Sequence, residues 1–145
     1  MAVTAFVFPL VFTAAFNKEI DLLDDAIKVA LTTSIYAVDQ DTHDYFNDVT
    51  NEVVGTGYTA GGVALATDTI TYTAGTNVWK YDADDSSWTT ATITARFAVV
   101  YDSTPATAAT QPLICYQNFG ADVVSTAGTF LITWNASGIF TITAS

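Results

Sequence analysis

The fold of this chain is decided by the stretch TATITARFAVVY, residues 90–101. β-Branched and aromatic residues dominate it, and its first half alternates polar and apolar side chains with the period of two of a β-strand. One face is expected to hold Ile93, Ala95, Phe97, Val99 and Tyr101. The other face starts with threonines and Arg96 and becomes apolar at Ala98 and Val100. The stretch therefore predicts a central strand that is covered on both sides in its second half.

Similar short patterns recur on both sides of this strand. Further strands are expected at residues 26–32, 67–73, 77–81, 112–119, 128–134 and 138–143. Turn residues separate them about every 8–12 residues, and long helical patterns are scarce. The sequence therefore predicts a mainly β, antiparallel β-sandwich or jelly-roll-like single domain, with at most one or two short helices near the N-terminus.

Two hairpins are predicted from neighbouring strands. Residues 67–73 and 77–81 flank a short turn at residues 74–76, and Trp79 and Tyr81 are expected to share a face. Residues 128–134 and 138–143 flank Asn135-Ala136-Ser137, and this pair is expected to close the chain as a terminal hairpin. The asparagine also matches a glycosylation sequon, which we discount because no secretion signal accompanies it.

The N-terminal segment, residues 1–19, is conspicuously apolar, and its first charged residue is Lys18. It lacks the basic start of a secretory signal. It is also shorter than the roughly 20 apolar residues of a membrane span, and Pro9 interrupts it. Two readings remain: a first strand followed by a short helix after Pro9, or an apolar arm that docks on a neighbouring subunit. Residues 20–145 are expected to form the β-sandwich domain.

The charge balance limits the partners. Fifteen acidic residues against four basic ones give a formal net charge of −11. Direct nucleic-acid binding needs a basic patch, and an anionic membrane surface repels an acidic chain, so neither partner is expected. An acidic exterior instead suits a basic protein partner.

Few groups are available for catalysis. The chain has one histidine, His43, and one cysteine, Cys115. We expect Cys115 to be a small buried hydrophobe and Arg96 to form a structural ion pair with an aspartate. Serine, histidine and aspartate occur without a Gly-x-Ser-x-Gly elbow. The sequence therefore predicts no enzyme, no catalytic residue and no cofactor.

Two acidic clusters could supply oxygen ligands to an ion. They comprise Asp39, Asp41 and Asp44 in one loop and Asp82, Asp84 and Asp85 in another. Neither has EF-hand spacing, and aspartate is also common in solvated turns, so no metal site is predicted although both alternatives stay open. Tyr45 and Phe46 are expected to pin the first loop to the body.

Four glycines punctuate the next loop: Gly55, Gly57, Gly61 and Gly62. No strand-loop-helix unit or P-loop lysine follows them. We expect them to serve positive φ angles and not to cradle a phosphate.

The order of several segments resembles a family of small virion structural proteins of tailed bacteriophages. The matching segments are residues 27–34, 39–46, 48–62, 93–101, 119–122 and 132–139. The likeness spans residues 20–145, and the glycine-flanked Tyr58 segment is its most distinctive part. The N-terminus departs from the family, whose members begin with a charged amphipathic stretch.

The resemblance implies a head decoration, or cement, protein on the outer surface of the phage head, made in the host cytoplasm. Its partners would be the major capsid protein and further copies of itself, as a trimer. The candidate interface residues are Phe6, Phe8, Pro9, Phe12, Phe16, Tyr58 and Trp88. The alternative is a tail or fibre protein with a glycan- or receptor-binding β-domain, in which Trp79, Trp88 and Tyr58 could stack on sugars.

Overall fold

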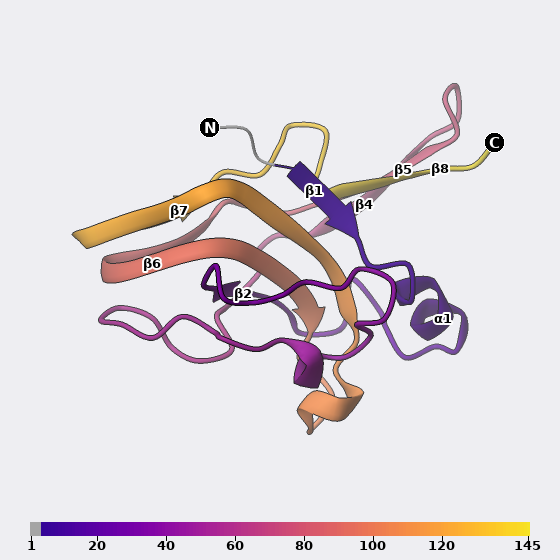
Figure 1. Cartoon of the computed structure of the whole chain (residues 1–145). Helices are drawn as coiled ribbons and strands as arrows, with labels where there is room; N and C mark the ends of the chain where they lie inside the picture. Colours follow the sequence, from indigo (N-terminus) through magenta and orange to yellow (C-terminus); the bar gives the residue numbers. More distant parts are fainter. Residues whose placement is uncertain (1–3) are drawn as a thin grey trace.

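Two antiparallel sheets form the framework of the computed structural model, which describes residues 4–145 (Figure 1). Strands account for 47% of the chain and helices for 8%, so the prediction of a mainly β, sandwich-like domain is confirmed. The strands are β1 (Thr4–Val7), β2 (Ile27–Thr32), β3 (Val63–Ala64), β4 (Thr69–Thr73), β5 (Val78–Asp82), β6 (Ser86–Asp102), β7 (Leu113–Ile132) and β8 (Phe140–Thr143). Helix α1 spans Val11–Phe16, and single 3₁₀ turns lie at Phe46–Asp48 and Ala108–Thr110.

The larger sheet has the order β1-β7-β6-β2-β3. Strand β6 lies at its centre, and residues 98–102 are buried. Ala98 and Val100 belong to one hydrophobic cluster, whereas Val99 and Tyr101 belong to a second cluster. The prediction of a central strand covered on both sides in its second half is therefore confirmed.

The predicted single face of β6 is wrong beyond Ala95. Ile93 and Ala95 belong to the first cluster, but Phe97 packs against the second, together with Val99. The reason is a β-bulge: Ala95 pairs with Val123 and Phe97 pairs with Asn118, so four residues of β7 oppose one of β6. Where the two paired strands contribute unequal numbers of residues, the alternation is broken, and the residues beyond the bulge lie on the opposite face of the sheet from the one that alternation predicts.

Arg96 lies at this bulge and holds it together. Its Nε donates a hydrogen bond to Asn118 Oδ1 at 3.3 Å, and its Nη1 lies 3.6 Å from Asp122 Oδ1. Asn118 Oδ1 also accepts a bond from the backbone N–H of Gly120. The predicted structural ion pair of Arg96 with an aspartate is confirmed.

The smaller sheet has the order β4-β5-β8. Its β4–β5 hairpin confirms the first predicted hairpin, with Tyr72 opposite Trp79 and Ile70 opposite Tyr81. The predicted terminal hairpin is wrong. Residues 128–132 continue β7 and pair with β6, whereas β8 pairs with β5. The two segments thus belong to different sheets.

The β6–β7 ribbon is long and sharply bent (Figure 1). Register shifts on both sides of Ala91 mark the bend, where Thr90 and Ala127 have φ angles of 53° and 49°. Beyond it, Trp88 pairs with Phe130, and both pack into the first cluster. The ribbon therefore contributes side chains to one core from both of its arms.

The described part of the N-terminal segment, residues 4–19, packs against the larger sheet. Strand β1 pairs with β7, and the backbone N–H of Phe8 donates to Ile114 O at 3.0 Å. Helix α1 follows Pro9, as expected. Cys115 on β7 is fully buried, and burial raises the pKa of its thiol to about 12, as suits the predicted small hydrophobe.

The glycine loop confirms the expectation of positive φ at three of its four positions. Gly57, Gly61 and Gly62 have φ angles of 80°, 87° and 74°. Gly55 instead permits close approach, because a Cβ there would lie 2.3 Å from the carbonyl oxygen of Thr92. These glycines hold the loop against β2 and β6.

Candidate functional site

An apolar cleft opens between α1 and the smaller sheet. Its volume is about 350 Å³. The cleft is lined by Val11, Phe12 and Ala15 of α1, by Ile20, Asp21 and Leu22 after it, and by Ile70, Ile114, Phe140 and Ile142 of the strands. One of these residues, Asp21, is charged. We call this set the apolar cleft.

An exposed apolar shelf continues the cleft along the smaller sheet. Its residues are Tyr72, Trp79 and Ile142, which lie opposite one another on β4, β5 and β8 and therefore share a face. Their exposed fractions are 48%, 46% and 36%. The rings of Tyr72 and Trp79 lie 4.8 Å apart, and Tyr72 Oη donates to Asn77 Oδ1. A pair of aromatic rings is thus held in place at the surface.

Helix α1 supplies the other wall. Phe12 lines the cleft and is 37% exposed, and Phe16 follows it four residues later and is 84% exposed. Side chains at this spacing lie on the same helix face. Of the two predicted interface residues on α1, Phe12 therefore lines the cleft and Phe16 is exposed on the same face of the helix.

The other predicted N-terminal residues lie elsewhere. Phe6 is 37% exposed and stacks on Tyr116 with ring centroids 5.1 Å apart, and Pro9 is exposed. Phe8 is fully buried in the second cluster, where it packs against Tyr116. The prediction of Phe8 as an interface residue is wrong, because its side chain completes the chain's own core.

Tyr58 and Trp88 are also structural. Trp88 is 3% exposed and packs edge-on to Phe130. Tyr58 stacks on Trp88, its hydroxyl donates to Glu52 Oε1 at 2.6 Å, and it accepts a bond from the Leu31 N–H. Burial, reinforced by the bond to Glu52, raises the pKa of Tyr58 well above its usual value. The hypothesis that Trp88 stacks on sugars or contacts a partner is therefore wrong, whereas Tyr58 is half-buried and its role at an interface stays a prediction.

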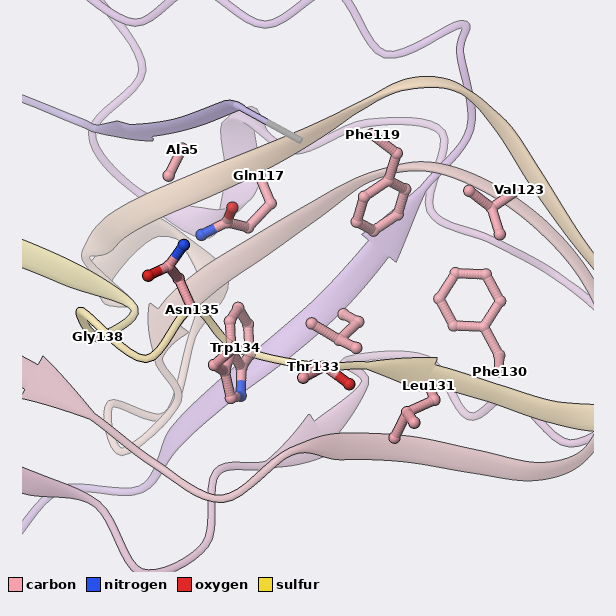
Figure 2. Close-up of a pocket in the computed structure, with 11 residues that line it drawn as sticks. Ala5, Gln117, Phe119, Val123, Phe130, Leu131, Thr133, Trp134, Asn135 and Gly138 are labelled. Atoms are coloured by element: carbon pink, nitrogen blue, oxygen red, sulfur yellow. The ribbon is translucent and has the colours of Figure 1, made fainter. Parts of the chain in front are cut away.

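A second hollow lies inside the bent ribbon (Figure 2). It measures about 310 Å³, and Phe119 and Phe130 face it from the two arms of β7. Its amides are bonded to the chain: Gln117 Nε2 donates to Ile139 O, and Asn135 Oδ1 accepts from the Ser137 N–H. This hollow is a packing space of the folded ribbon, so the more exposed apolar cleft is the better candidate site.

The acidic clusters take part in local structure. Asp39 Oδ1 accepts bonds from the N–H groups of Asp41 and Thr42, and bonds to Thr42 and Asp41 hold the pKa of Asp39 below its usual value. Asp84 Oδ2 accepts from the Thr67 hydroxyl, and Asp85 Oδ1 accepts from the Trp134 N–H. Within residues 4–145, no group of three or more His, Cys, Asp or Glu residues is placed to hold a metal ion.

The loop around His43 is pinned to the body, as expected. Phe46 stacks on Tyr101 with centroids 3.9 Å apart, and Tyr45 Oη donates to Glu19 Oε2 at 2.9 Å. His43 Nδ1 lies 2.9 Å from Tyr36 Oη. These contacts give the histidine a structural partner.

The part of the chain that the structure describes contains no helix long and apolar enough to cross a membrane. Comparison of the chain with models of protein families, with curated proteins and with solved structures found no match.

Proposed function

We propose that the protein is a non-enzymatic structural component of a phage particle that decorates the outside of the head. In this role it binds the major capsid protein and stabilises the capsid lattice. The proposal extends the resemblance of the sequence to small phage virion proteins. It needs a rigid domain with a surface suited to protein contact.

The observation that carries the proposal is the apolar cleft together with its shelf. Tyr72 and Trp79 of the shelf expose about half of their side chains beside Ile142, which lines the cleft, and Phe16 is exposed on the helix that forms the other wall. Contiguous exposed apolar surface of this kind marks sites of protein interaction. Aromatic residues are also the ones that most often supply binding energy at interfaces.

On a capsid lattice, weak binding by each copy of the protein is sufficient. Many copies on one particle add avidity, so each cleft can bind weakly. We propose self-association as a trimer, because closed symmetry covers the edges of outer strands such as β3 and β4.

The test is the number of copies per particle, measured by quantitative mass spectrometry on particles purified from the virus that encodes the chain. A ratio to the major capsid protein near one-to-one or one-to-two supports the proposal. A handful of copies per particle, or absence from purified particles, overturns it.

A second candidate function rests on the Tyr72–Trp79 pair. Their adjacent, half-exposed rings, tilted by 31° to each other, offer an aromatic surface on which a sugar ring could lie. A tail or fibre protein that binds host glycans would use such a surface and would be present in few copies. Retention on a glycan array that is lost in Trp79→Ala, together with a low copy number, favours this alternative.

A further inference from the structure

We propose that the apolar cleft takes a basic amphipathic segment of the partner protein. The apolar side chains of the segment lie in the cleft and over Trp79, and its lysines or arginines lie over the acidic loop at residues 18–25. This inference rests on the proposed function in that it treats the cleft as the docking surface. It adds the chemistry of what docks there.

The charge of the cleft rim favours a basic partner. Asp21 lines the cleft, and Glu19, Asp24 and Asp25 lie in the same short loop, with Lys18 as its single basic residue. Asp21 and Asp24 are not neutralised by an ion pair within residues 4–145. Complementary charge across an interface steers association and fixes the orientation of the partner.

The charge is unevenly distributed over the site. Asp21 lines the cleft, whereas the shelf carries Tyr72, Trp79 and Ile142 and no charged side chain. A segment that contacts both parts therefore has basic residues where it meets Asp21 and large apolar residues where it meets the shelf. Trp79 and Tyr72 also tolerate a cation over their ring faces.

A single short segment can reach both parts of the site, because Ile70 of β4 lines the cleft and Tyr72, two residues later on the same strand face, belongs to the shelf. Amphipathic helices commonly bind in apolar grooves through side chains at i, i+3, i+4 and i+7.

A second copy of the chain is the less suitable occupant. Each copy has a net charge of −11, so docking the same face on itself brings two acidic loops toward each other. Like charges at an interface disfavour association.

The protein provides its own optical probe for the test. Trp79 is 46% exposed, whereas Trp88 and Trp134 are 3% and 8% exposed. Acrylamide quenching of tryptophan fluorescence therefore reports mainly on Trp79. We would titrate the full chain with a 12-residue helical peptide of leucine and lysine, with the lysines toward one end, and with a counterpart in which glutamate replaces each lysine.

The lysine peptide is expected to bind, to protect Trp79 from acrylamide and to bind more weakly as salt is added. The double variant Asp21→Asn/Asp24→Asn is expected to bind the lysine peptide about 2- to 30-fold more weakly than the wild type. The amide oxygen that this variant carries at position 21 can still accept the bonds that Asp21 Oδ1 receives from the Leu23 and Asp24 N–H groups. The matched control Asp39→Asn/Asp41→Asn removes two carboxylates that do not line the cleft, and the affinity of this variant for the lysine peptide should equal that of the wild type. The amide oxygen at position 39 can still accept the bonds that Asp39 Oδ1 receives from the Asp41 and Thr42 N–H groups.

Three results would overturn the inference: no protection of Trp79 by the lysine peptide, equal binding of the glutamate peptide, or equal weakening by the control pair. Sedimentation of the protein alone tests whether a second copy of the chain occupies the cleft. A dimer in which Trp79 is protected from acrylamide would assign the cleft to self-association and would also overturn the inference. Failure of these tests leaves the copy number per particle unaffected, so the proposed function is judged separately.

Discussion

Phe119 and Phe130 lie on the same strand, eleven residues apart, yet their ring centroids are 6.1 Å apart. A straight strand of that length would separate them by about 36 Å. Strand β7 therefore folds back on itself, and β6 follows it through the bend. Thr90 and Ala127, which both have positive φ, provide the change of direction.

Replacing Ala127 with glycine should relieve backbone strain at the bend. A non-glycine residue in the left-handed region is strained by about 1 kcal/mol or more, so Ala127→Gly is expected to raise the free energy of unfolding by about 0.5–1 kcal/mol. Urea denaturation measures the change. In the control, Ala121→Gly, the φ angle is not positive, and glycine should lower stability by about 0.5–1 kcal/mol. Equal destabilisation by both substitutions would contradict the prediction.

The strands of this ribbon can be predicted from the sequence, but their pairing cannot. Alternation in residues 112–119 and 128–134 identifies two strands, because periodicity is a local property. The small and polar residues between them suggest a break, whereas the structure pairs them with β6 as one strand. Neighbouring strands often pair, so a terminal hairpin is the natural expectation. The long-range pairing of β8 with β5 leaves no local signal.

The glycine loop offers a matched pair of substitutions. A Cβ on Gly62 would lie 1.9 Å from Val29 O, and its φ of 74° adds strain, so Gly62→Ala should lower the free energy of unfolding by more than about 3 kcal/mol. A Cβ on Gly75 would meet none of the described atoms within 4 Å. Gly75→Ala should change stability by less than about 1 kcal/mol. Thermal unfolding of both variants checks this, and similar melting temperatures would refute it.

Asp102 should make stability fall as pH rises. Its carboxyl is fully buried, and burial, with Asp25 nearby, raises its pKa above 3.8. The folded chain thus holds this proton more tightly than the unfolded chain. Its stabilising contribution is complete below pH 3.8 and is lost as pH rises through the folded-state pKa.

The Asp102→Asn variant removes this titration. Relative to the wild type, it should gain stability as pH rises from 4 to 8, as measured by urea midpoints. Asp39→Asn is the contrasting control, because the lowered pKa of Asp39 gives a contribution that is already present above pH 3.8, so its difference from the wild type should change little between pH 4 and 8. A constant difference between Asp102→Asn and the wild type across this range would rule out the assignment.

The candidate site is only partly predictable from the sequence. The lack of charge before Lys18 draws attention to Phe12, which lines the cleft, and to Phe16, which is exposed on the same helix. The same reasoning misplaces Phe8 and Trp88, because aromatic residues serve cores and interfaces alike and only burial separates the two uses. Alternation in β4 and β5 places Trp79 on an apolar face. It does not show that the side chains of Tyr72 and Trp79 on this face are left exposed to solvent.

Phe16 and Phe8 should therefore separate docking from folding. Phe16 is 84% exposed, so Phe16→Ala should leave the free energy of unfolding within about 0.5 kcal/mol of the wild type. Phe8 is fully buried, and Phe8→Ala should cost about 3–5 kcal/mol. If the cleft binds the capsid, Phe16→Ala should weaken co-sedimentation of the folded protein with purified capsids by about 5- to 30-fold. Undiminished capsid binding by this variant would place the contact on another face of the molecule, because α1 forms one wall of the cleft.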